Sequence, residues 1–184
     1  YPLPKLSAGV HRITICVDNT DYPTKGGHLT SPDTQTNWNG ITGRIELQVR
    51  PKAHIDNVMI IPDVGKNGIA VKFAATDGGA VSAYVEGYEK QEFSVRQGEN
   101  SFFYSPSEKM PLWSEYNPQV LTLVTEFGGE EQRHTFGMRK IWTDGLKIYV
   151  NGNETFMRGK HDGLVFPLTG YAPTTVSEWR RVLE

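Results

Sequence analysis

The chain has 184 residues, of which 38% are hydrophobic and 22% charged, a composition typical of folded rather than disordered proteins. Its 19 basic and 21 acidic residues give a net charge of −2, which excludes a general electrostatic grip on nucleic acid or on an anionic membrane. No apolar run approaches the roughly 18 residues of a membrane-spanning helix, and the single cysteine, Cys16, excludes an internal disulfide framework and a cysteine-rich zinc site.

The first segment, residues 1 to about 50, has the pattern of the last part of a sheet domain. Residues 10–17 and 44–49 alternate apolar and polar side chains, which predicts two strands. The polar stretch between them, residues 18–43, is far longer than an ordinary hairpin loop. Because two strands alone do not form a stable domain, we expect this segment to complete a larger one.

The second segment, residues 54 to 142, predicts a β-sandwich. Turn residues separate the candidate strands, which are 54–61, 68–73, 81–89, 92–96, 100–104, 119–127 and 132–141. About seven short strands at this spacing indicate an immunoglobulin-like sandwich. Without a cysteine pair, side-chain packing alone must hold its two sheets together.

The third segment, residues 143–184, begins with a predicted hairpin whose turn is Asn151-Gly152. Further on, Thr175 and Glu178 have the spacing of a helix capping box. The apolar residues that follow share one face of a helix and are Val176, Trp179, Val182 and Leu183. Strand, loop and capped amphipathic helix open a βα unit. One unit has nothing to pair with, so we expect the chain to be a piece of a longer polypeptide.

Four runs of the sequence, taken in chain order, resemble motifs of one enzyme family. They read GITGRIEL at 40–47, WSEYNPQVLTL at 113–123, FGMRKI at 136–141 and IYVNGNETFMRG at 148–159. These are similar to the "G-I-x-R-x-v-x-L", "W-x-P-x-x-P-x-L-Y-x-L", "F-G-x-R" and "f-x-l-N-G-k-p-x-x-l-R-G" motifs of glycoside hydrolase family 2, the β-galactosidase, β-mannosidase and β-glucuronidase family.

The resemblance implies an all-β core flanked by two partial domains. Residues 1–51 would be the C-terminal part of the sugar-binding jelly roll, and residues 52–142 the immunoglobulin-like β-sandwich. Residues 143–184 would be the truncated start of the catalytic (β/α)₈ TIM barrel. The helix at 175–184 would then be the first barrel helix.

The function implied by the resemblance is O-glycosidic bond hydrolysis in carbohydrate catabolism by an exo-acting, β-galactosidase-like retaining enzyme. Such enzymes need two carboxyl groups about 5–5.5 Å apart, which in this family are glutamates on later barrel strands. Glu154 lies before the barrel, and the neighbours Glu130 and Glu131 point to opposite faces of a strand. The chain therefore holds no catalytic residue and should be inactive, serving as a scaffold that supplies loops to the sugar pocket. We expect no cofactor and no metal.

Six residues are candidates for sugar binding in the complete enzyme, and they are Asp33, Asn37, Trp38, Arg158, His161 and Asp162. The last two would lie at the C-terminal end of the first barrel strand, where barrel enzymes place function; an ion pair or loop cap is the alternative. The first three lie in the 18–43 loop, which in family members reaches over the barrel mouth, although Trp38 could simply pack beneath that loop. For Arg158 a structural role inside the barrel is the alternative.

One departure from the family follows Arg158-Gly159, where Lys160-His161-Asp162-Gly163-Leu164 stands in place of the usual "x-N-x-H-E". The substrate of the best-studied members therefore does not carry over, and a divergent subgroup is indicated. The expected partners are a carbohydrate and the remainder of the chain's own barrel, with self-association through the exposed ends. A bacterial, periplasmic or secreted parent fits the family. Two other hypotheses stay open, a stand-alone carbohydrate-binding module and a purely structural sandwich domain.

Overall fold

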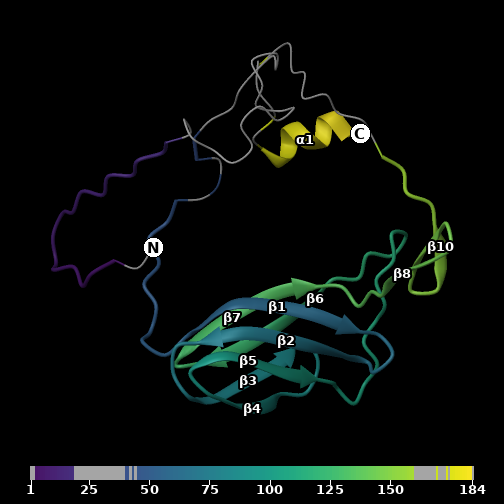
Figure 1. The fold of residues 1–184 in the computed structure, drawn as a ribbon, viewed down its shortest axis with the longest axis horizontal. Helices are drawn as coiled ribbons and strands as arrows, with labels where there is room; N and C mark the ends of the chain where they lie inside the picture. Colours follow the sequence, from purple (N-terminus) through teal and green to yellow (C-terminus); the bar gives the residue numbers. More distant parts are fainter. Residues whose placement is uncertain are drawn as a thin grey trace. The chain divides into compact units, whose positions relative to one another are not determined.

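The computed structural model describes residues 3–18, 40, 41, 43, 45–159, 169, 173 and 175–183. The contacts of the chain divide it into two compact units. The larger one is Leu47–Arg158, and the smaller one combines Tyr1–Glu46 with Gly159–Glu184. Figure 1 shows the strands of the larger unit and helix α1 of the smaller one.

The larger unit is built on a sandwich of two antiparallel sheets that lie face to face (Figure 1). One sheet has the order β1-β2-β5, with strands β1 (Ile55–Asp63), β2 (Gly68–Ala75) and β5 (Gly98–Tyr104). The other has the order β4-β3-β6-β7, with strands β4 (Gln91–Val95), β3 (Gly79–Val85), β6 (Leu121–Phe127) and β7 (Glu130–Phe136). Seven strands in two sheets confirm the predicted all-β sandwich.

The core forms where the apolar positions of the alternating strands face each other. Phe73, Val81 and Leu123 are almost fully buried, together with Tyr104. Each such side chain contributes about 1.5–3 kcal/mol of transfer free energy. Tyr104 is the largest of them, and its hydroxyl donates a 2.8 Å hydrogen bond to the carbonyl of Glu89, which satisfies its polar atom. Packing thus joins the two sheets without a disulfide.

Two of the strand predictions are wrong in an instructive way. Residues 10–17 and 45–49 form no strand, and their apolar side chains are exposed, Ile13 to 58% and Leu47 to 63%. Within the described part of the chain these segments have no ladder partner, and alternation alone does not make a strand without one. The assignment of residues 1–51 to a jelly roll stays a prediction.

The predicted strand 132–141 is two strands in two different sheets. Strand β7 ends at Phe136, and β8 (Ile141–Asp144) begins a separate meander with β9 (Lys147–Val150) and β10 (Asn153–Thr155), in the order β10-β9-β8. The break falls at Gly137, where a Cβ atom would lie 3.0 Å from the Trp113 ring. The hydrogen-bond ladder of β7 therefore ends before Gly137, where the Trp113 ring packs against the backbone.

The predicted turn and helix cap are both confirmed. Asn151 and Gly152 have φ angles of 49° and 88°, as a two-residue type I′ hairpin turn requires. In the smaller unit, α1 (Val176–Leu183) follows Thr175, whose hydroxyl accepts a 3.3 Å bond from the Glu178 amide. The Glu178 carboxylate accepts one of 3.1 Å from the Thr175 amide in return. The described part of the chain contains no helix with the length and hydropathy of a membrane span.

Candidate functional site

The structure describes only one of the six predicted sugar-binding residues. Asp33, Asn37, Trp38, His161 and Asp162 lie outside the described residues. Arg158 is described and is exposed, three residues after the end of β10. Arg158 is the last residue of the larger unit, and its expected place in the barrel stays a prediction.

Three of the four sequence motifs instead meet at one end of the sandwich. Trp113 lies in the connection between β5 and β6, and its ring packs on Gly137 just after β7. The Arg139 guanidinium lies over the same ring, 5.2 Å from its centroid, in a cation–π contact. The Trp113 amide donates a 3.0 Å hydrogen bond to the Met138 carbonyl. We call this arrangement of Trp113, Gly137, Met138, Arg139 and Asn151 the motif junction.

Asn151 ties the meander to this junction. Its Nδ2 donates to the carbonyl oxygens of Trp113 at 2.8 Å and Met138 at 2.9 Å. Its Oδ1 accepts a 2.8 Å bond from the Lys140 amide. The sequence motifs mark Trp113, Met138 and Asn151 as family residues but do not predict that they contact one another, because the contacts join positions up to 38 residues apart.

A second polar cluster closes the side of the sandwich between the edge strands β1 and β7. The Arg50 guanidinium grips the Glu130 carboxylate with two hydrogen bonds, Nε to Oε1 at 2.9 Å and Nη2 to Oε2 at 2.7 Å. Arg50 also pairs with Asp56 and donates a 2.7 Å bond to the Ile55 carbonyl. The pairing with Arg50 lowers the pKa of Glu130 to about 2, and the pKa of Arg50 is raised, chiefly by Glu130.

A hollow of about 430 Å³ lies beside this cluster. His134, on β7, lines it, and burial lowers the pKa of this imidazole. Gln132 donates to both the Ile55 carbonyl and the Glu130 carboxylate, at 2.8 and 2.9 Å. Most of the hydrogen-bonding capacity around Glu130 is thus used within the protein, which indicates a structural clamp.

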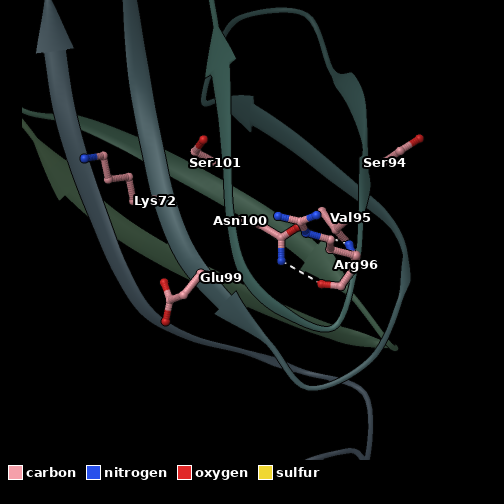
Figure 2. Close-up of a pocket in the computed structure, with 7 residues that line it drawn as sticks. All are labelled: Lys72, Ser94, Val95, Arg96, Glu99, Asn100 and Ser101. Atoms are coloured by element: carbon pink, nitrogen blue, oxygen red, sulfur yellow. Dashed lines mark hydrogen bonds between the residues drawn. The ribbon is translucent and has the colours of Figure 1, made fainter.

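A larger open hollow of about 650 Å³ lies beside the β4–β5 turn (Figure 2). Figure 2 shows the Lys72 and Glu99 side chains pointing to the same side, away from Asn100 and Arg96. The Asn100 amide is occupied by the turn itself, since it binds the Arg96 amide and the carbonyls of Arg96 and Gly98 at 2.7–3.0 Å. The polar groups do not converge on one point, as a catalytic or sugar site would require.

The carboxylates considered from the sequence are engaged in ion pairs with neighbouring cations. Glu154 binds Lys147 at 2.9 Å across the meander. Glu131 binds Arg133 at 2.8 Å, whereas its neighbour Glu130 is held by Arg50. Among the described residues no group of histidine, cysteine and carboxylate side chains could hold a metal ion.

An immunoglobulin-like sandwich extended by a pinned meander is the architecture that the described residues define. No protein-family model and no curated protein matches the sequence. Among solved structures, the GH2 (glycoside hydrolase family 2) β-galacturonidase of Eisenbergiella tayi bound to galacturonate aligns with 75% of the chain at a TM-score of 0.53 and 17% identity. The same enzyme bound to glycerol aligns with the same coverage and TM-score.

A β-glucuronidase of Faecalibacterium prausnitzii aligns with 59% of the chain at 22% identity and a TM-score of 0.48. The chain spans 27% of the length of the galacturonidase, about a quarter of that enzyme. The chain therefore has the fold of the matching part of a family 2 glycoside hydrolase, and the resemblance seen in the sequence motifs is confirmed at the level of the fold.

Proposed function

We propose that this chain is the central, non-catalytic part of a retaining family 2 exo-β-glycosidase. The observation that carries the proposal is the agreement of two independent signals. The fold matches a family 2 enzyme over 75% of the chain, and three family motifs meet in space at the motif junction. Motifs that are scattered over the sequence and yet form one contact set have a shared structural task.

The proposed division of labour follows the sequence segments. Residues 52–142 would hold the jelly-roll segment 1–51 and the barrel segment 143–184 in fixed relation. Asp33, Asn37 and Trp38 from the first segment, and Arg158, His161 and Asp162 from the last, would complete the sugar pocket. Small misplacements of such groups are costly for catalysis, so holding them is a contribution to the rate. A periplasmic or secreted bacterial location belongs to the same proposal.

Exposed apolar side chains on the larger unit support the proposal that a further segment of the same polypeptide covers this surface. Leu146, Phe156 and Met157 lie in or just after the meander and are exposed to 104%, 85% and 61%. Apolar surface of this kind is typical of a surface that another domain covers. Within the proposal, that domain is the rest of the barrel. When the 184 residues are alone, we expect the same surface to mediate self-association.

The test is to express the complete reading frame to which this chain belongs and to assay it beside the 184 residues alone. The probes are the p-nitrophenyl β-glycosides of galactose, glucuronic acid and galacturonic acid. We expect hydrolysis by the complete protein and none by the 184 residues. His161→Ala and Asp162→Ala in the complete protein should raise KM or lower kcat, and Lys5→Ala, near the start of the chain, serves as the matched surface control.

Two results would overturn the proposal. One is a reading frame that adds no barrel to the chain. The other is saturable binding of a mono- or oligosaccharide by the 184 residues alone in isothermal titration, which would support the stand-alone module.

A further inference from the structure

The Asn151-Gly152 turn makes more contacts than a hairpin turn needs. A two-residue type I′ turn requires positive φ at both central residues, which asparagine, aspartate and glycine all tolerate. The φ angles here, 49° and 88°, meet that requirement through the backbone alone. The turn by itself does not explain why residue 151 is asparagine.

The three side-chain hydrogen bonds of Asn151 do explain it. Two donors reach the Trp113 and Met138 carbonyls, and one acceptor takes the Lys140 amide. An asparagine supplies two donors and an acceptor at this length, whereas an ionised aspartate has no donor and glycine has no side chain. Asparagine at residue 151 therefore suits the turn, as aspartate or glycine would, and it alone of the three also supplies the side-chain bonds of the junction.

These bonds run from the meander to the sandwich. Met138 is 1% exposed and belongs to the core, and Trp113 is fixed to it by the backbone bond at 3.0 Å. The meander consists of three strands of three or four residues, too little to hold its own orientation. Its place on the sandwich must come from contacts such as those of Asn151.

We propose that Asn151 is a positioning residue. Its side chain holds the meander in one orientation on the sandwich, so that residues 156–158 leave β10 in one direction. Only the biological role of this orientation rests on the proposed function, because in that proposal the residues after β10 enter the catalytic barrel. The fixed orientation itself is a property of the larger unit.

The experiment measures orientation rather than stability. Spin labels are placed at Leu146→Cys, at the exposed tip between β8 and β9, and at Ser101→Cys on β5, in the full 184-residue chain with Cys16→Ser. Double electron–electron resonance then gives the distance distribution between the labels. Asn151→Gly and Asn151→Asp keep the turn and remove the two donated bonds. Asn153→Ala, an exposed residue two positions further on, is the matched control.

We expect a narrow distribution in the parent and in Asn153→Ala, and a width greater by about twofold or more in both Asn151 variants. Amide exchange at Lys140 should accelerate in the same variants, while exchange at Val71 in the sandwich stays unchanged.

A distribution that stays narrow in Asn151→Gly overturns the inference. Loss of the sandwich itself, seen as faster exchange at Val71, overturns it as well, because Asn151 would then be a general stability residue. None of these readouts needs glycosidase activity. An inactive complete protein would leave the inference standing, and a failed inference would leave the proposed function standing.

Discussion

Removing the Arg50 side chain tests the clamp between the entry to β1 and strand β7. In Arg50→Ala the Glu130 carboxylate, 22% exposed, loses its cation and its two strongest hydrogen bonds. Lowering the pKa of Glu130 from 4.5 to about 2 is equivalent to about 3 kcal/mol of stability at neutral pH. Because a fifth of each side chain faces solvent, we expect a loss of about 2 kcal/mol at pH 7.

The loss should depend on pH in a defined direction. The folded-state pKa of Glu130 lies below the unfolded value, so its contribution is complete above pH 4.5 and disappears as the pH falls toward about 2. At about pH 3 less than half of the effect should remain. Urea unfolding of parent and variant at pH 7, 4 and 3, followed by tryptophan fluorescence, measures this difference.

Arg133→Ala is the matched control, because Arg133 also lies on β7 and pairs with Glu131 and Glu86. That arginine is 51% exposed, so the control should lose less than about 1 kcal/mol. An Arg50→Ala penalty no larger than that of the control, or one that is the same at pH 7 and pH 3, would refute the reasoning.

Three further changes test the packing of single positions. Gly128→Ala should lower the free energy of unfolding in urea by about 2–4 kcal/mol, because a Cβ there would lie 1.9 Å from the Ala53 carbonyl oxygen at a φ of 60°. Gly129→Ala, where a Cβ meets nothing within 4 Å, should lower it by only about 1 kcal/mol, and equal losses in the two variants would contradict this prediction. Thr125→Val should raise the free energy of unfolding by about 1 kcal/mol, because Oγ1 is buried without a hydrogen-bond partner among the described residues; a loss in the same assay would show that the hydroxyl is satisfied. Thr175→Ala removes the helix cap and should destabilise α1 by about 1 kcal/mol, measured as faster amide exchange within 176–183, and unchanged exchange would mean that the capping box contributes nothing.

The sandwich could be predicted because its signals are local. Alternation between buried and exposed positions in β2 and β3, with glycine turns between strands, depends on neighbouring residues only. The Asn151-Gly152 turn and the Thr175 cap are also local and were predicted correctly. The same alternation failed at residues 10–17, because a strand also needs a partner that the sequence pattern does not reveal.

The site contacts could not be predicted because they are not local. Arg50 and Glu130 are 80 residues apart in sequence, and no local pattern around either residue predicts their contact. The motifs marked Trp113 and Asn151 as family residues, but their hydrogen bond depends on how two connections cross at the end of the sandwich. Five of the predicted sugar-binding residues lie outside the described residues, and their role stays a prediction from the sequence; they are Asp33, Asn37, Trp38, His161 and Asp162.

The side-chain bonds of Asn151 also have a chemical consequence. Asparagine is chemically labile, and an asparagine followed by glycine can deamidate: the Gly152 nitrogen attacks Asn151 Cγ, ammonia leaves, and water then opens the ring to aspartate or isoaspartate. In the folded chain the amide is held by three hydrogen bonds, which restrain the rotation that this attack requires. The native state thus protects the residue, and each excursion to the unfolded state exposes it to a slow, irreversible conversion. The fraction of Asn151 that has become acidic in a stored sample would therefore record how much time the chain has spent unfolded.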